Sequence, residues 1–323
     1  MDSSLERATK LRKLRDLRQN TPHASKAAVA GLLNNVSKSG LPELTSANNI
    51  REANRQLLEE CDAYGPLFKE VSFKCKDGST LQLHVLNLLT FLFQAFCAGG
   101  AFYDLIKTFA DAEEAAGLIL YSDEICPCNP LASVASRKLW ILSAAIKEMG
   151  VALCNENSWV TLFVCRSSLV SQSEGHMAQV MRVLLEGIFD RNFAEVQALG
   201  ILLKSPAKDA LEPYCRLRLK FQCSVQDGAA MKCSYSMKGD AGTRFCVLCA
   251  NAFSRRDNED DLSEVSKFLN VSDLRLTTNQ ELLDSWKRLM VKMIEETQEQ
   301  FKLREQATGW FFSSEALWSS RKL

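Results

Sequence analysis

Hydrophobic and polar residues alternate along several segments of the chain, and in others apolar residues recur at helical spacing. In 71–85 the alternation runs on both sides of Asp77-Gly78, which predicts a hairpin because Asp-Gly favours a tight turn between strands. The stretch 174–189 carries apolar residues every three or four positions, which predicts a helix. Further strands are expected over 117–123, 138–147, 158–166 and 215–226. Further helices are expected over 50–65, 86–98, 101–116, 262–270 and 278–306.

The order of these elements indicates a single mixed sheet. Three strands follow one another as a meander from residue 117, a helix crosses over, and a fourth strand then comes at 215–226. We expect the fourth strand to lie beside the first, in an α/β fold whose mixed sheet has flanking helices. The expected parts are a basic, mostly disordered arm (1–49), a hairpin plus helical N-terminal part (50–116), the core (117–227), a cysteine-bearing insertion (228–261) and a helical extension (262–323) that we expect to be truncated.

The composition allows a sizeable core and gives no net charge. Of 323 residues 46% are hydrophobic, and 39 basic side chains balance 39 acidic ones, so overall basicity offers no argument for nucleic-acid binding. Twelve cysteines spread through a long chain with a charged first segment indicate a reducing, intracellular location, nuclear or cytoplasmic. The basic segment 1–20 is interpreted as a solvated tail, a nucleic-acid contact or a nuclear address. The longest apolar run, 86–101, is too short to cross a bilayer, so no membrane partner is expected.

Two apolar runs each end on a carboxylate, about a hundred residues apart. The run GLILYSD ends on Asp123, and the alternating run at 217–226 leads to Asp227. Two carboxylates held at neighbouring strand ends can bind Mg²⁺ or Mn²⁺ and support phosphoryl transfer. The alternative is that each aspartate simply caps a loop, as most strand-end aspartates do. Glu124 should point to the opposite face of its strand, so it is a weaker candidate ligand.

The insertion carries a cysteine pair. Cys246 and Cys249 follow a glycine-rich turn and have the spacing of half a zinc site. Cys233 is the best-placed further ligand, and Cys223 is the other cysteine nearby. Buried free thiols are an alternative of equal weight, whereas redox chemistry is weaker because the expected βαβ context is absent. His176 is isolated, with no serine or cysteine nucleophile motif to pair with it, so a hydrolase triad has no support.

Four motifs in a fixed order carry a resemblance to a known family. They are LYSDE at 120–124 followed by NPL, DGAAMK at 227–232, KGDAGT at 238–243, and the CxxC at 246–249. In this order they resemble transposase-like proteins of cut-and-paste DNA elements, including a group present in many copies in protist genomes. The resemblance spans roughly residues 55–320.

The resemblance implies a ribonuclease H-like core that binds DNA. It implies that Asp123 and Asp227 are the first and second metal-binding acids, for Mg²⁺ or Mn²⁺, and that the cysteine pair belongs to an insertion before a third acid. Directly before the NPL motif this chain has Cys128, where relatives tend to have glycine. The chain also has glutamates beyond the insertion that match no third-acid motif: Glu281, Glu295, Glu296 and Glu299.

We therefore predict a transposase-derived DNA-binding protein whose ancestral activity is metal-dependent strand cleavage and transfer. Because a third ligand is not matched, we expect this copy to be inactive or incomplete, and whether it is an enzyme stays open. A homo-oligomer is a candidate assembly. The rival hypothesis is a non-enzymatic binding or scaffold protein, in which the cysteines and the helix at 281–306 serve stability or partner contact.

Overall fold

The computed structural model describes residues 33–34, 36–37, 61–62, 64–126, 138–205, 214–253 and 271–320. The chain divides into two compact units, Met1–Leu57 and Leu58–Leu323. In the first unit the four described residues are helical, and the rest of the predicted arm at 1–49 lies outside the described residues. The second unit contains the sheet, the candidate site and the C-terminal helices.

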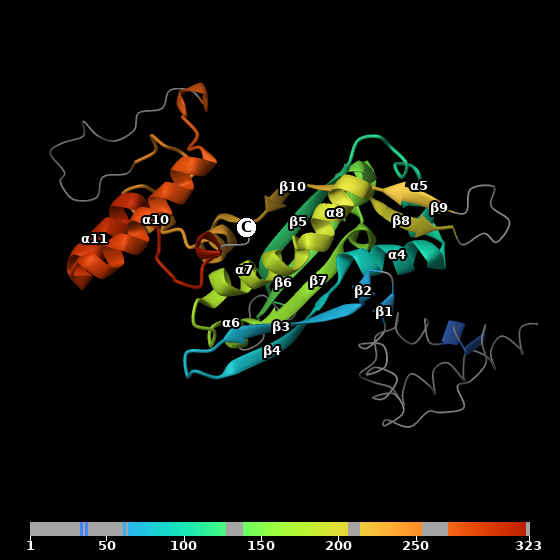
Figure 1. The fold of residues 1–323 in the computed structure, drawn as a ribbon, viewed down its shortest axis with the longest axis horizontal. Helices are drawn as coiled ribbons and strands as arrows, with labels where there is room; N and C mark the ends of the chain where they lie inside the picture. The colour runs from blue at the N-terminus through green and yellow to red at the C-terminus, as the bar shows by residue number, and fades with distance from the viewer. Residues whose placement is uncertain are drawn as a thin grey trace, which may run out of the picture. The chain divides into compact units, whose positions relative to one another are not determined.

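A four-stranded mixed sheet forms the centre of the second unit (Figure 1). Its strands are β5 (Ala116–Ile125), β6 (Leu139–Ile146), β7 (Val160–Arg166) and β10 (Leu219–Val225), in the spatial order β10-β5-β6-β7. β6 is antiparallel to both β5 and β7, whereas β10 is parallel to β5. The predicted meander, and the predicted place of the fourth strand beside the first, are therefore confirmed, as is the mixed α/β class.

The remaining strands form two-stranded ribbons. The predicted hairpin is confirmed, and its turn is closed by Asp77, whose carboxylate accepts hydrogen bonds from the N–H (2.9 Å) and the hydroxyl (2.6 Å) of Ser79. Gly78 in the same turn has φ +80°, a conformation that glycine adopts without strain. The ribbons are β1 (Cys61–Asp62) with β2 (Gly65–Pro66), β3 (Phe68–Lys74) with β4 (Thr80–Leu86), and β8 (Ile201–Lys204) with β9 (Tyr214–Leu217).

Helix α7 is the predicted crossover between β7 and β10, and it covers one face of the sheet (Figure 1). Seven of its thirteen residues are buried, because its apolar positions recur at helical spacing. The helices are α4 (Leu88–Ala98), α5 (Ala101–Lys107), α6 (Ser167–Val170), α7 (His176–Ile188), α8 (Arg191–Leu199), α9 (Gly228–Tyr235), α10 (Asn279–Glu295) and α11 (Gln298–Thr308). Short 3₁₀ segments are η2 (Lys147–Cys154), η3 (Glu156–Ser158), η4 (Gly239–Ala241), η6 (Val271–Asp273) and η7 (Leu317–Ser319).

Two clusters of buried side chains stabilise the second unit. The main core joins the sheet, the β3–β4 hairpin and α7, and includes Leu118, Leu142 and Leu184, each at most 1% exposed. A second cluster, which we call the C-terminal core, joins α10 to the aromatic residues that follow α11. In it Trp286 (0% exposed) stacks on Phe312 with ring centroids 5.3 Å apart. The members of the C-terminal core are Ala178, Val247, Leu282, Trp286, Leu289, Trp310 and Ala316.

Several predicted elements differ in the structure. The helix predicted over 101–116 is helical only over Ala101–Lys107, and Ala116 already belongs to β5. The end of the predicted helix 50–65 is wrong, because Cys61–Asp62 and Gly65–Pro66 pair as strands. The predicted strand 215–226 divides at Arg218: its first part joins β8 in a separate ribbon, and its second part is β10. The insertion from 228 opens with helix α9 instead of a turn, because Asp227 caps it.

The long helix predicted over 278–306 is two helices. Thr278 with Glu281 starts the first with a capping box, and Thr297 with Gln300 starts the second in the same way. A second capping box inside an apolar pattern marks a new helix start, so the break was readable from the sequence. The predicted helix at 262–270 lies outside the described residues.

No described helix is long and apolar enough to span a membrane by itself. The sharply bent pair α4 and α5 meets the length and composition test only when the two helices are taken together.

Candidate two-carboxylate site and the adjoining groove

The sheet brings the ends of β5 and β10 together. These two strands are parallel neighbours, with Val225 opposite Tyr121. Asp123 lies two residues beyond Tyr121, and Asp227 lies two residues beyond Val225. Because the strands run in the same direction, both aspartates lie at the same end of adjacent strands, as the sequence predicted.

Asp123 is oriented by a tyrosine from its own strand. The Tyr121 hydroxyl donates to Oδ2 of Asp123 at 2.8 Å, and the N–H of Glu124 donates to Oδ1 at 2.7 Å. Trp159 packs edge-on against the Tyr121 ring, with centroids 5.9 Å apart. The hydrogen bond to Asp123, burial, and the charges of Asp123 and Asp227 all raise the pKa of Tyr121, so the phenol stays protonated and keeps donating.

Asp227 has a structural role at the start of a helix that the sequence analysis did not predict. It is the N-cap of α9, and its Oδ1 accepts the N–H of Ala230 at 2.6 Å. The residue is exposed, and its charge contributes to raising the pKa values of both Tyr121 and Cys233. Within the described residues its Oδ2 accepts no hydrogen bond. Asp227 is therefore a cap, as the alternative proposed, but of a helix and not of a loop.

The Glu124 side chain lies on the face of β5 opposite Asp123, as the alternation of side chains along a strand predicts. Its carboxylate accepts from Lys138 Nζ at 2.7 Å. Burial alone would raise the pKa of Glu124, but the Lys138 and Ser167 side chains lower it overall. Glu124 is thus ionised and paired.

Glu124 also lines a groove of about 1160 Å³, hereafter the groove. The groove extends from the end of β5 to the first turn of α7, and its walls include α6, α9 and the segment after α11. Cys233 and Lys232 border it on α9, the helix that Asp227 caps. The groove shares β5 and α9 with the carboxylate pair, but on β5 it is lined by Glu124, whose side chain points to the face opposite Asp123.

The cysteine pair lies in a compact loop organised by an arginine. The Sγ atoms of Cys246 and Cys249 are 3.5 Å apart, and burial followed by the hydrogen bond to Cys246 raises the pKa of Cys249. Arg244 donates to the carbonyls of Val247 (3.1 Å) and Cys249, and to the hydroxyl of Thr277 (2.8 Å). These bonds fix the loop against the segment before α10.

The structure does not bring Cys233 to this pair. Burial, and then the charges of Glu124 and Asp227, raise the pKa of the Cys233 thiol. Within the described residues no three or more His, Cys, Asp or Glu side chains form a group that could hold a metal. The cysteine pair supplies two of the four ligands that structural zinc needs, so zinc there stays a prediction beside the free-thiol alternative.

Three of the four unmatched glutamates of the C-terminal helices have other partners. Glu281 belongs to the capping box of α10, Glu295 pairs with Lys292 at 2.7 Å, and Glu296 pairs with Arg304. None of them belongs to a group of metal-binding type in the described part of the chain. The NPL motif and Cys128 lie outside the described residues.

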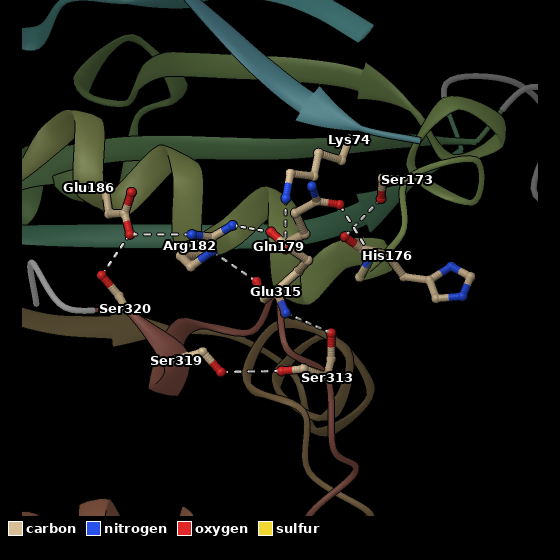
Figure 2. Close-up of polar contacts among 11 residues, drawn as sticks. Lys74, Ser173, His176, Gln179, Arg182, Glu186, Ser313, Glu315, Ser319 and Ser320 are labelled. Carbon is tan, nitrogen blue, oxygen red and sulfur yellow. Dashed lines mark hydrogen bonds and ion pairs between the residues drawn. The ribbon is translucent and has the colours of Figure 1, made fainter. Parts of the chain in front are cut away.

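Sequence reasoning missed the polar contacts that join the C-terminal segment (residues 310–320) to α7 (Figure 2). Arg182 forms an ion pair with the Glu315 carboxylate, and its Nε donates to the Glu315 carbonyl at 2.9 Å. Glu186 accepts from the Ser320 hydroxyl at 2.6 Å. An arginine and a glutamate 133 positions apart carry no pairing signal in a single sequence.

Comparison with known proteins does not assign the chain to a family. The sequence matches no protein-family model and no curated protein.

Proposed function

We propose that the chain is a transposase-derived, DNA-binding protein with a ribonuclease H-like core, whose carboxylates Asp123 and Asp227 bind Mg²⁺ or Mn²⁺. The supporting observation is the sheet order, because a fourth strand parallel to the first of a three-strand meander is the strand arrangement of such a core. That order sets two carboxylates at the ends of neighbouring strands.

The donor set suits a hard cation. Mg²⁺ is bound in proteins through one or two carboxylates, with waters and substrate phosphates completing its octahedron. Asp123 is held by Tyr121, and Asp227 is held by the first turn of α9, so both carboxylates are oriented before metal arrives. A metal bound there would activate a water or a 3′-hydroxyl and neutralise phosphate charge.

With only Asp123 and Asp227 as acidic ligands, we expect weakened strand cleavage. Efficient two-metal strand transfer uses a further acid to hold the second ion, and the described residues offer no third acid to this site. We therefore propose metal and DNA binding with slow nicking at most, in the nucleus or the cytoplasm.

The test is cleavage of labelled duplex DNA during a Mn²⁺ titration, with the parent chain beside Asp123→Asn and Asp227→Asn. Asparagine keeps the shape of each side chain, and at position 227 it also keeps the helix cap. We expect metal-dependent nicking in the parent chain and none in either variant. Glu295→Gln, which removes an exposed carboxylate remote from the carboxylate pair in the sequence, is the matched control and should behave as the parent.

The rival function is a non-enzymatic scaffold, and one observation favours it. Both aspartates already have internal hydrogen bonds that explain their presence without a metal. In that case the parent chain and both asparagine variants would bind no Mn²⁺ and leave the DNA intact.

A further inference from the structure

The proposed function gives no role to the cysteine pair, Cys246 and Cys249. The two Sγ atoms are 3.5 Å apart, and the Cys246 thiol donates to the sulfur of Cys249. Both side chains are partly exposed, so a small reagent can reach them. A disulfide bond joins sulfur atoms about 2 Å apart, so the two sulfurs need to approach one another by only about 1.5 Å.

Backbone hydrogen bonds hold the loop that carries the pair. The N–H of Thr277 donates to the Leu248 carbonyl at 2.9 Å, and the N–H of Ala250 donates to the Arg275 carbonyl at 2.7 Å. Inside the loop, the N–H of the second cysteine donates to the carbonyl of the first at 3.3 Å. The backbone therefore places the two cysteines together before any bond forms between them.

Val247, between the two cysteines, anchors the loop in the C-terminal core. Its side chain is 1% exposed. The loop also lies against the chain after α11, because a Cβ added at Gly309 would come within 3.2 Å of the Val247 side chain and would clash with the Arg244 carbonyl. Burial of Val247 thus favours one conformation of the loop, and that conformation holds the thiols side by side.

The number of ligands favours a disulfide over a metal site. Zinc in a structural site takes four ligands. In the part of the chain that the structure describes, no third His, Cys, Asp or Glu joins the pair in a group that could hold a metal. A disulfide needs only the two thiols and access to them. Among the described elements the pair falls between η4 and η6, not at the strand-to-helix junction of thioredoxin-like catalysts, so we assign it no catalysis.

We propose that Cys246 and Cys249 form a reversible disulfide by reaction with glutathione disulfide. The thiolate of one cysteine attacks a sulfur of the reagent, the S–S bond of the reagent breaks, and one glutathione leaves. The other cysteine then attacks the mixed disulfide, the internal S–S bond forms, and the second glutathione leaves. The two cysteines lose two electrons, the reagent is reduced to two thiols, and the two cysteine protons end on the released glutathione molecules.

This bond is a modification that responds to redox conditions, not a permanent cross-link. It joins residues three positions apart, and so short a loop gains little stability from lost chain entropy. In the reducing location that the sequence predicts, the pair stays as thiols and closes when the ratio of glutathione disulfide to glutathione rises. Neither aspartate of the carboxylate pair takes part, so the inference is independent of the proposed function.

The test uses the full chain and reads the pair in a single peptide. Trypsin cleaves after Arg244 and Arg255, so peptide 245–255 contains both cysteines of the pair and no other. Peptide 221–232 contains only Cys223, which is exposed and reports unassisted oxidation. The reduced protein is incubated in EDTA without oxygen at graded ratios of glutathione disulfide to glutathione. It is then quenched with acid, alkylated, denatured and digested, and peptide masses distinguish free thiols, glutathione adducts and internal bonds.

We expect peptide 245–255 to lose two hydrogens at a ratio at least about tenfold lower than the ratio that half-modifies Cys223, because its second thiol attacks within the same molecule. Dithiothreitol should restore both thiols. The closed protein should melt at the same temperature as the reduced one or slightly above it. In Cys246→Ser a glutathione adduct should accumulate on Cys249 instead. Cys223→Ser is the matched control and should close as the parent does.

Three results would overturn the inference. The first is a pair of glutathione adducts on peptide 245–255 with no internal bond. The second is two unreacted thiols at ratios that already modify Cys223. The third comes from repeating the experiment with one equivalent of Zn²⁺ in place of EDTA: zinc that binds the parent but not Cys246→Ser, and that prevents closure, would make the pair metal ligands. The parent peptide reports closure by itself, so the conclusion does not depend on whether the serine variant folds.

Discussion

The contact between Arg182 and Glu315 offers a quantitative test of how the C-terminal segment is attached. The two side chains are only 21% and 13% exposed, and Lys74 adds a weaker contact to Glu315 at 3.5 Å. In Glu315→Gln the arginine loses its carboxylate but keeps its bond to the backbone carbonyl of residue 315. It also keeps Glu186 at 3.7 Å.

The expected cost follows from burial. Removing one partner of a fully buried ion pair costs about 3–5 kcal/mol, and partial exposure with a remaining carboxylate reduces this to about 2 kcal/mol. For a domain of this size class that corresponds to a fall in melting temperature of about 4–8 °C. Tryptophan fluorescence should report it, because Trp286 and Trp310 lie in the C-terminal core.

The control is Glu295→Gln, which breaks the exposed pair with Lys292. An exposed pair contributes about 0–1 kcal/mol, so the melting temperature should fall by at most about 2–4 °C. If the two variants shift the transition equally, the burial argument is wrong and the C-terminal segment is held by its aromatic residues alone.

Three further predictions concern the carboxylates and the C-terminal core. Tyr121→Phe should weaken Mn²⁺ binding several-fold while costing about 1 kcal/mol of stability, because only the bond that orients Asp123 is lost; calorimetry with unchanged affinity would contradict this. Asp227→Ala should lower the free energy of unfolding by about 1 kcal/mol relative to Asp227→Asn, measured by urea denaturation, because alanine cannot cap α9. Trp286→Ala should cost about 3–5 kcal/mol in the same assay, and a loss below about 1 kcal/mol would show that the C-terminal core is not packed around it.

Much of the central sheet could be predicted from the sequence, because each strand there is a local pattern. The apolar runs of β5 to β7 are short-range signals that the central sheet then satisfies, and the alternation and Asp-Gly turn of the hairpin are such signals for the separate β3–β4 ribbon. The division of the segment 215–226 is different. β9 pairs with β8, which was not predicted as a strand, so the break depends on a partner elsewhere in the chain.

The sequence predicted only some of the features of the candidate site. Asp123 and Asp227 could be singled out because each ends an apolar run, and strand order then brings those ends together. The capping role of Asp227 was available from Asp-Gly-Ala-Ala before a helix, but the segment was interpreted as a turn. The Arg182–Glu315 pair gave no local signal, since a long-range contact creates its role.

The most direct test of the proposed metal site is Mn²⁺ binding measured by calorimetry on the parent chain and on Asp227→Asn. The two proteins should have the same melting temperature, because asparagine caps α9 as well as aspartate does. The account predicts that the parent binds Mn²⁺ and that the variant loses this binding. Equal binding by both proteins, or none by the parent, would contradict a metal site formed by Asp123 and Asp227.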